Sequence, residues 1–534
     1  MLEAIKEFYY NVGKRTSYKV WIGICAIISY GFSFFNRTVS IEGLSDDRYY
    51  FNYKTQLGLI AGKRWGFYIY RFLFSTERGT VSADRIMAVL FMILAAFILC
   101  VIAHYLSNNS LHFLSYPAIS AIFISFPLIN EISEYSGTYA YIGMEFFLMS
   151  LSVLIYLTSG WSTTKKIVTE SFLLTLIAAG YESGVFAYIT LVLLVLCLKI
   201  INKTSQYSIK NYIIEGGLLA IPLVIAVVIK YLIGYLLIVI LGAPSGTMGA
   251  SGILWGQADS NLWITIKTNI YLYFARGVVY LPLTVFVTVT IIAIVCLLSN
   301  KCNRAMGTIA YLVALISVFA QSFVSCSAMP YRTAQTVWVF TAFSIFIICK
   351  IVCEKGDKRV LYALFGILLL VSLKQSLFLN ELLNLNNLRS ENEAYLARQI
   401  GYRITTECDT SKPVVIVGSY YEGEWIDSAM SIREPSIFLK IDNKARVFLG
   451  LPKVDSERSV DTNVRSYLSW GVRATGMEDL EVLKWYFSYW GYDINVLKEV
   501  SSDEKSSYEA MAHDMGMKRL DIKELDQIIR VYLG

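Results

Sequence analysis

The chain has 534 residues, of which 55% are hydrophobic and only 16% are charged. Soluble globular proteins carry about 25% charged residues, so this composition, with a mean hydropathy of +0.52, indicates a polytopic membrane protein. The net charge of +6 is not gathered into a basic stripe, which excludes a nucleic-acid-binding protein.

Windows of about 20 apolar residues predict roughly eleven transmembrane helices in the first part of the chain. The run from 166 to 201 is either two short helices that meet at Gly180–Gly184 or one long broken helix. The first run lacks the small-residue cleavage site of a secretory signal, so we expect a retained anchor. The predicted spans lie near 18–36, 86–106, 111–130, 139–158, 166–181, 183–201, 212–241, 281–299, 305–327, 334–353 and 360–379.

Lysine and arginine residues gather in alternate loops, which sets the predicted orientation. Short loops rich in these residues stay in the cytoplasm, so residues 1–17 are predicted to be a cytoplasmic N-terminus. An odd number of helices then places the tail after Leu379 outside, together with the loop 38–85. The Gly-rich segment 242–262, which has no Lys or Arg, is outside as well. The basic loops contain Lys165–Lys166, Lys199–Lys210, Lys301–Arg304 and Lys355–Arg359.

Residues 380–534 have the length and the pattern of a separate α/β domain. An apolar run that ends in Gly, Pro413–Gly418, is typical of a buried strand. Two predicted helices have acidic starts that suit the helix dipole. We therefore expect a small α/β domain on the outer, periplasmic face. Its predicted helices are Arg389–Glu407, Asp479–Trp490 and Ser502–Met515, and its closing strand is Ile528–Leu533.

The outer loop 38–85 carries two adjacent carboxylates, Asp46 and Asp47, just past the end of the first span. Charged groups are costly to place next to a membrane span, which indicates a function. One carboxylate is suited to act as general base on an acceptor hydroxyl, while the other orients it or holds the donor sugar or a metal. The alternative is a solvated acidic pair in which Ser45 or Asp46 caps the next helix.

The same loop contains the cluster Gly62–Gly66, in which Lys63 and Arg64 precede Trp65. Lys and Arg bind phosphate through charge-assisted hydrogen bonds, and a Trp at membrane depth can stack on a sugar or an isoprenoid. The alternative is interfacial anchoring, in which cations and aromatic rings lie among the lipid headgroups. The cluster as a whole favours a functional role.

Two more charged residues lie at predicted outer ends of helices. Glu182 lies within apolar sequence, where an ionisable group is a functional hypothesis by default; the alternative is a helix-end residue that reaches water. Arg332 lies in a loop with few cations and is suited to bind a leaving phosphate, with a lipid headgroup contact as the alternative. All these candidates fall on one predicted face, which indicates one extracytoplasmic site.

The pattern resembles a known family. A first membrane helix is followed by an outer loop with Asp-Asp, an amphipathic stretch, a Gly-Lys-Arg-Trp sequence, a many-helix bundle and an outer tail. It is similar to the O-antigen serotype-converting glucosyltransferases, the type II glucosyl transferase group, within the membrane glycosyltransferases of GT-C fold. The chain departs from the family's usual Gly-Arg-Trp by inserting Lys63, and from its frequent Gln by carrying Glu182. The matching landmarks are Leu44–Asp47, Gly62–Trp65, Gly180–Glu182 and Ile528–Leu533.

This resemblance implies an inner-membrane enzyme that transfers a sugar, usually glucose, from undecaprenyl phosphate to the O-antigen polysaccharide on the periplasmic side. Asp46 or Asp47 is the expected general base, and Glu182 is a further catalytic candidate. The departing phosphate is expected to contact Arg332, Lys63 and Arg64, and the substrate to contact Trp65 and Tyr181. The stretch 49–75 is expected to lie in the membrane interface and to form one wall of the lipid groove.

Two other functions remain open: a flippase or transporter for polyprenyl-linked sugars, and an O-antigen polymerase. A transporter is expected to have polar residues at mid-span in two similar halves, and the sequence shows Lys230 as its one marked mid-span charge. No cofactor is expected, because two adjacent carboxylates are too few ligands for a divalent cation and the chain has only three histidines. Most of the nine cysteines lie in or beside apolar runs, so no disulfide framework is expected.

Overall fold

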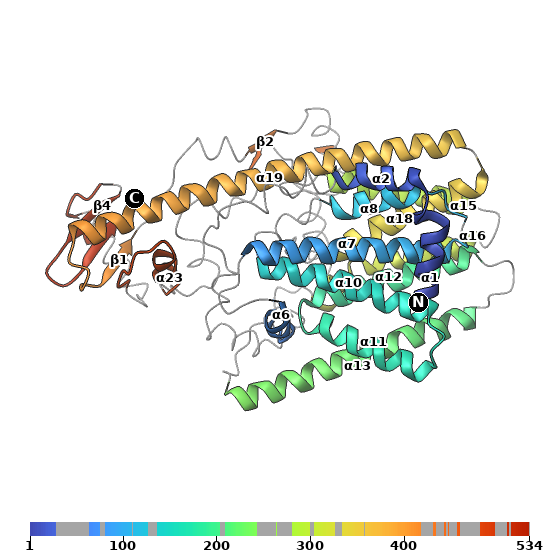
Figure 1. The fold of residues 1–534 in the computed structure, drawn as a ribbon, viewed down its shortest axis with the longest axis horizontal. Coiled ribbons are helices and arrows are strands. Elements are labelled where there is room, and N and C mark those ends of the chain that lie inside the picture. Colours follow the sequence, from blue (N-terminus) through green and yellow to red (C-terminus); the bar gives the residue numbers. More distant parts are fainter. Residues whose placement is uncertain are drawn as a thin grey trace. The chain divides into compact units, whose positions relative to one another are not determined.

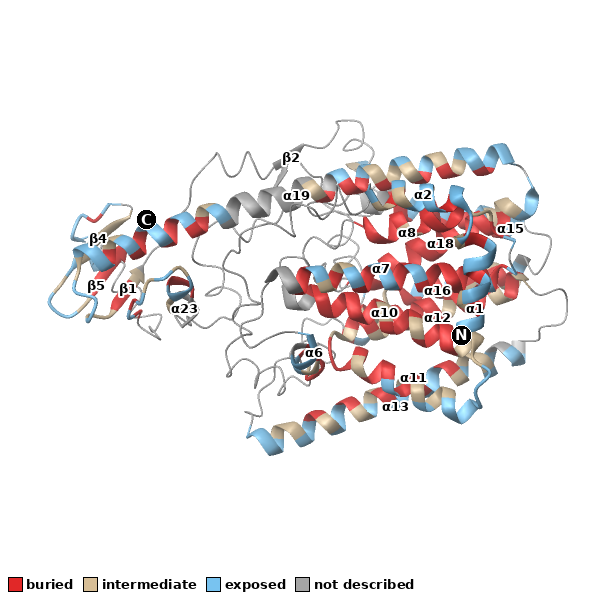
Figure 2. Ribbon diagram, viewed as in Figure 1, coloured by how far each residue is buried: buried red, intermediate tan, exposed pale blue. Residues whose placement is uncertain are grey.

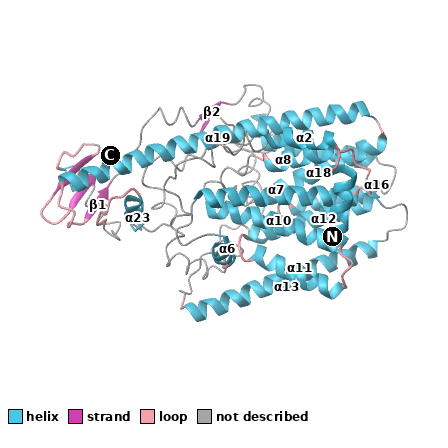
Figure 3. Cartoon of the chain, viewed as in Figure 1, coloured by secondary structure: helices cyan, strands magenta, loops and turns pink. Residues whose placement is uncertain are grey.

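The computed structural model describes residues 1–27, 64–74, 81–108, 110–126, 136–202, 209–242, 263, 280–299, 304–325, 334–356, 358–417, 431–433, 443–444, 447, 457–459, 481–496, 510–511, 514–518 and 520–532. They belong to two compact units, one ending at Glu381 and one beginning at Leu382. Helices form nearly all of the described part of the larger unit, and all the described strands lie after residue 413 (Figure 3).

The larger unit is a bundle of apolar helices. Backbone N–H and C=O groups find no water inside a bilayer, so apolar runs of this length fold as helices that satisfy these groups internally. The elements are α1 (Leu2–Phe8), the π-helix η1 (Tyr9–Gly13), α2 (Thr16–Ala26), α6 (Gly66–Phe74), α7 (Val81–Leu106), α8 (Ser115–Ile124), α10 (Ser136–Thr158), α11 (Thr163–Ala178), α12 (Glu182–Asn202), α13 (Ile209–Leu241), α15 (Tyr280–Ser299), α16 (Arg304–Ser317), α17 (Ala320–Ser325), α18 (Gln335–Lys355) and α19 (Lys358–Glu407).

Six helices of the described chain are long and apolar enough to cross a membrane, and this indicates a membrane protein. They are the spans Asp84–Leu106, Tyr139–Thr158, Glu182–Asn202, Ile213–Leu241, Gln335–Lys355 and Lys358–Leu377. Three shorter apolar helices, Ser115–Ile124, Val285–Ser299 and Ala305–Ser317, accompany them. The predicted total of eleven crossings is not reached by the described residues and stays a prediction.

The helices differ in how deeply they lie within the bundle (Figure 2). In α18, 89% of the most apolar stretch is buried, so this helix forms the core. In α13 only 17% is buried, and apolar side chains such as Val224, Val228 and Val239 are more than half exposed. Helix α6 is seen nearly end-on in Figure 1, so it runs across the direction of the long helices. The exposed apolar face of α13 is typical of lipid contact.

Several predicted boundaries differ from the observed ones. The run 166–201 is two helices, α11 and α12, separated at 179–181, as one of the two alternatives predicted. The run 305–327 is also divided, into α16 and α17. The span 360–379 and the helix Arg389–Glu407 are parts of one continuous helix, α19, because no Gly or Pro lies between them to end it.

The smaller unit contains a three-stranded sheet of order β1-β5-β4. Strands β1 (Val414–Val417) and β5 (Ile529–Tyr532) are parallel, with Val414 opposite Ile529, and β4 (Asp521–Glu524) is antiparallel to β5. The two strands predicted from Pro413–Gly418 and Ile528–Leu533 are therefore confirmed. A second pair of strands, β2 (Ser431–Arg433) and β3 (Glu457–Ser459), is antiparallel.

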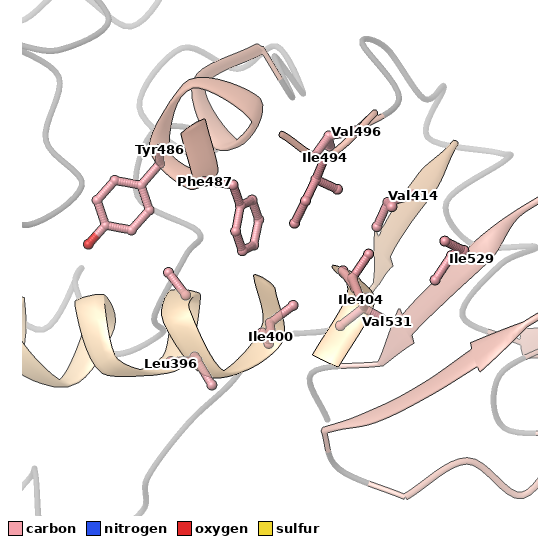
Figure 4. Packing of buried hydrophobic residues seen from close by; sticks show 11 residues of the cluster. Leu396, Ile400, Ile404, Val414, Tyr486, Phe487, Ile494, Val496, Ile529 and Val531 are labelled. Atoms are coloured by element: carbon pink, nitrogen blue, oxygen red, sulfur yellow. The ribbon is translucent and has the colours of Figure 1, made fainter. Parts of the chain in front are cut away.

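One apolar core holds the smaller unit together (Figure 4). The end of α19 and the helix α23 (Glu481–Tyr489), which confirms the prediction at Asp479–Trp490, pack against the sheet. The predicted helix Ser502–Met515 lies largely outside the described residues, and the outer location of this unit stays a prediction. The core side chains are Leu396, Ala397, Ile400, Ile404, Val414, Tyr486, Phe487, Ile494, Val496, Ile529 and Val531.

Candidate functional site

Three charged side chains from separate parts of the larger unit meet, and we call them the cation–carboxylate cluster. Lys230 Nζ donates to Glu182 Oε1 at 2.8 Å, and Arg64 Nη2 donates to Glu182 Oε2 at 3.3 Å. The side chain of Lys230 is 4% exposed, whereas those of Arg64 and Glu182 are 30% and 40% exposed. The cluster is therefore open to the surface at Arg64 and Glu182 and closed on the side of Lys230.

The three residues are positioned by different elements. Arg64 lies just before α6, and Lys230 lies well inside α13. Glu182 is the first residue of α12, where the helix dipole favours a carboxylate. The indole Nε1 of Trp65 donates to the backbone oxygen of Lys230 at 3.1 Å, which ties the Arg64 segment to α13. A buried ammonium is tolerated only when it is paired, and Glu182 supplies its partner.

Two glycines allow the segment around Arg64 to approach the break between α11 and α12. The backbone N–H of Gly66 donates to the oxygen of Ala179 at 2.9 Å, and a Cβ at Gly66 would lie only 2.9 Å from that oxygen. A Cβ at Gly180 would overlap the ring of Tyr141. A larger residue at Gly66 would therefore push the Arg64 segment away from the break, and one at Gly180 would push the break away from Tyr141 of α10.

Tyr181 links the cluster to the bundle interior. Its ring lies 5.0 Å from the guanidinium carbon of Arg64, which is the geometry of a cation–π contact. Its backbone N–H donates to Glu145 Oε1 at 2.8 Å. The ring of Phe67 makes an edge contact with it at 5.8 Å. Tyr181 therefore helps to hold Arg64 over Glu182.

Glu145 is a site residue that the sequence analysis missed. It lies in α10, is fully buried, and receives a second hydrogen bond from Gln335 Nε2 at 3.4 Å. Its oxygens thus connect the break before α12 with the start of α18, three residues after Arg332. A carboxylate inside the apolar run 139–158 was the available signal. The prediction that Lys230 is the one marked mid-span charge is therefore wrong.

Four predicted site residues come together in the structure: Arg64, Trp65, Tyr181 and Glu182. Lys230 joins them, although its position in the sequence predicted no role in the site. The other four, Asp46, Asp47, Lys63 and Arg332, lie outside the described residues, and their roles stay predictions.

Trp65 has the surroundings of a core side chain. It is 4% exposed and packs against Ala179 and against apolar residues of α13, including Ile233 and Leu237. With its indole N–H bonded to the backbone of Lys230, the ring contributes mainly to holding the cluster together. Its expected stacking on a sugar stays a prediction.

The cluster has the chemistry of an anion-binding site. Two cations contact one carboxylate, so the three residues together carry a formal charge of +1, and Arg and Lys are the residues that recognise phosphate. Within the described ranges, no group of three or more His, Cys, Asp or Glu side chains has the arrangement of a metal site.

Comparisons with known proteins add little to this geometry. No protein-family model and no curated protein matches the chain. One solved structure, the Archaeoglobus fulgidus oligosaccharyltransferase in complex with Zn and sulfate, aligns with a TM-score of 0.36 and 12% identity. The alignment covers 77% of this chain and 61% of the archaeal one. A TM-score of that size does not establish a shared fold.

Proposed function

We propose that the protein transfers a sugar, expected to be glucose, from an undecaprenyl-phosphate carrier to the O-antigen polysaccharide at the periplasmic face of the bacterial inner membrane. The cation–carboxylate cluster supports this function because it places the partly exposed Arg64, a residue suited to bind phosphate, beside the ends of apolar helices. A lipid-linked phosphate needs both features, since its headgroup is charged and its chain stays in the bilayer. The fold expected for such an enzyme is of the GT-C type.

The chemistry needs a base and a phosphate site. Asp46 or Asp47 takes the proton of the acceptor hydroxyl, whose oxygen attacks C1 of the sugar. The bond between C1 and the phosphate oxygen breaks, and its electron pair leaves with undecaprenyl phosphate. Arg332, together with Lys63 or Arg64, stabilises the charge that develops on the departing phosphate.

Glu182 and its two partners prepare the phosphate site. In the absence of substrate, Glu182 compensates the charges of Arg64 and Lys230 and fixes their positions. When the donor binds, the Arg64 guanidinium exchanges its contact with the Glu182 carboxylate for a contact with the donor phosphate. Such preorganised charges avoid the reorganisation that water would require during the reaction.

The function is tested on the surface polysaccharide of a competent host, with and without the protein. Sugar composition and linkage are compared for the unchanged chain and for Asp46→Asn, Asp47→Asn and Arg64→Gln at equal membrane expression. We expect a new side-branch sugar that one Asp substitution reduces about a hundredfold or more, and that Arg64→Gln also reduces. Lys165→Gln, which changes an exposed cation over Trp161 away from the cluster, is the matched control.

Two outcomes contradict the proposal. If sugar addition survives in the double variant Asp46→Asn/Asp47→Asn, the assigned base is wrong. If the polysaccharide is unchanged in a host that supplies both donor and acceptor, the reaction itself is wrong. A flippase would instead alter the amount of lipid-linked sugar that reaches the outer leaflet, and a polymerase would alter chain length without a new branch.

A further inference from the structure

A second ligand site is indicated at the other end of the larger unit. There, η1, the turn after α7, the end of α18 and the start of α19 surround a cavity of about 460 Å³. Figure 1 shows α6, next to the cation–carboxylate cluster, at one end of this unit and the N-terminus at the opposite end. Cavities of about 300–1,000 Å³ are the usual size for small-molecule sites. The walls are Asn11, Val12, Arg15, His104, Ser110, Leu111, His112, Phe113, Val352, Cys353, Gly356, Lys358 and Leu361.

The cavity carries two cations, Arg15 and Lys358, that form no ion pair with a described carboxylate. Arg15 uses its Nε to donate to the backbone oxygen of Asn11 at 2.9 Å, and its guanidinium carbon lies 6.0 Å from the ring of Phe113. Its two terminal nitrogens form no ion pair with any described residue, and the same holds for the ammonium of Lys358. The described wall residues include no Asp or Glu. Asp357 lies outside the described residues.

These two cations also affect the protonation of His112, which lines the same cavity. Burial, Arg15 and Lys358 together lower the pKa of His112 below its usual value. The backbone N–H of Leu114 donates to His112 Nδ1 at 3.4 Å, so the neutral ring carries its proton on Nε2. Within the described chain, Nε2 has no hydrogen-bond acceptor. The cavity thus offers a neutral donor beside two positive charges.

Part of the remaining wall is apolar, with Val12, Leu111, Phe113, Val352 and Leu361 lining the cavity, and the rest carries polar groups of Asn11, His104 and Ser110. Two cations and an N–H donor match the oxygens of a phosphate group. The apolar side chains match a hydrocarbon part attached to it. The ligand class with both features is a phosphate ester, and its source is either the headgroup of a membrane phospholipid or a soluble phosphate.

We propose that this cavity binds a phosphate-bearing ligand, with Arg15 and Lys358 holding the phosphate and His112 Nε2 donating to it. The site is separate from the cation–carboxylate cluster and does not depend on the proposed sugar transfer. Because the distribution of Lys and Arg predicts a cytoplasmic N-terminus, the ligand is expected to reach the cavity from the cytoplasmic side.

The test is direct binding to the purified full chain in a neutral detergent. Three probes are titrated while the unfolding temperature is followed: inorganic phosphate, dihexanoyl phosphatidylglycerol and the zwitterionic dihexanoyl phosphatidylcholine. Arg15→Gln and Lys358→Gln are each expected to weaken binding about tenfold, because a charge-assisted hydrogen bond is lost. Lys355→Gln is the matched control, since Lys355 is bonded to Ser299 Oγ at 2.9 Å and does not line the cavity.

The probes also identify the source of the ligand. Binding of phosphatidylglycerol without inorganic phosphate assigns a lipid headgroup, and binding of both shows that the phosphate alone suffices. The proposal is overturned if none of the three probes binds, if binding is undiminished in the double variant Arg15→Gln/Lys358→Gln, or if Lys355→Gln weakens binding equally. The unfolding temperatures of the variants without ligand verify that each is folded.

Discussion

The pairing of Lys230 with Glu182 leads to an asymmetric prediction for stability. The side chain of Lys230 is 4% exposed, whereas that of Glu182 is 40% exposed and also has Arg64 as a partner. Glu182→Gln therefore leaves a buried ammonium without a counter-charge, while Lys230→Met leaves a carboxylate that keeps Arg64 and water. The first variant should lose much more stability than the second.

The magnitudes follow from the burial of each group. Removing one partner of a fully buried pair costs about 3–5 kcal/mol. Because water reaches Glu182 and because Gln can still accept one hydrogen bond, we expect Glu182→Gln to cost about 2–3 kcal/mol of the free energy of unfolding. Lys230→Met should cost at most about 1 kcal/mol, as for a partly exposed ion pair.

The double variant decides between this explanation and a general loosening of the helices. With neither charge present, Glu182→Gln/Lys230→Met should return to within about 1 kcal/mol of Lys230→Met alone. The measurement is the free energy of unfolding of the four proteins, obtained by titrating SDS into mixed micelles. Equal losses in the two single variants, or a double loss equal to their sum, would refute the reasoning.

Two further predictions concern packing and pH. Gly180→Ala, whose Cβ would overlap Tyr141, should cost about 1–3 kcal/mol, while Gly160→Ala, with nothing within 4 Å, should be neutral in the same unfolding measurement. Burial and two nearby cations lower the pKa of His112 in the folded state, so the unfolded chain takes up a proton first and stability falls as the pH drops below about 6.5. His112→Gln should flatten the decline of the unfolding temperature between about pH 7 and 5, and an unchanged slope would contradict this.

The sequence predicted those parts of the fold that depend on local composition. Long apolar runs became α7, α10, α12 and α18 because a membrane leaves the backbone no alternative to a helix. The Gly180–Gly184 segment marked a break, since glycine weakens a helix and permits close approach. The apolar run Pro413–Gly418 contains strand β1, in which Val414 packs into the core formed with α19 and α23.

The partners within the site were not predictable in the same way. Hydropathy fixes where a helix lies in the chain but not how it is rotated, and Lys230 meets Glu182 only because α13 turns that residue inward. Glu145 is similar, because a single carboxylate in an apolar run gives no indication of whether it faces Tyr181, lipid or water. The end of the last predicted span at 379 indicated a domain boundary, yet α19 continues through the asparagines at 384, 386 and 387, since they are only mildly unfavourable in a helix.

On the proposed function, Glu182 both organises the phosphate site and competes with the phosphate for Arg64. Glu182 makes Lys230 tolerable in an apolar helix and holds Arg64 at the surface, so it is needed before any substrate arrives. A phosphate that binds Arg64 must then compete with this carboxylate. The competition lowers the affinity for phosphate, while the carboxylate keeps the Arg64 side chain in a fixed position. Such an exchange suits an enzyme that must release undecaprenyl phosphate after each transfer, because the carboxylate replaces the departing anion at the guanidinium.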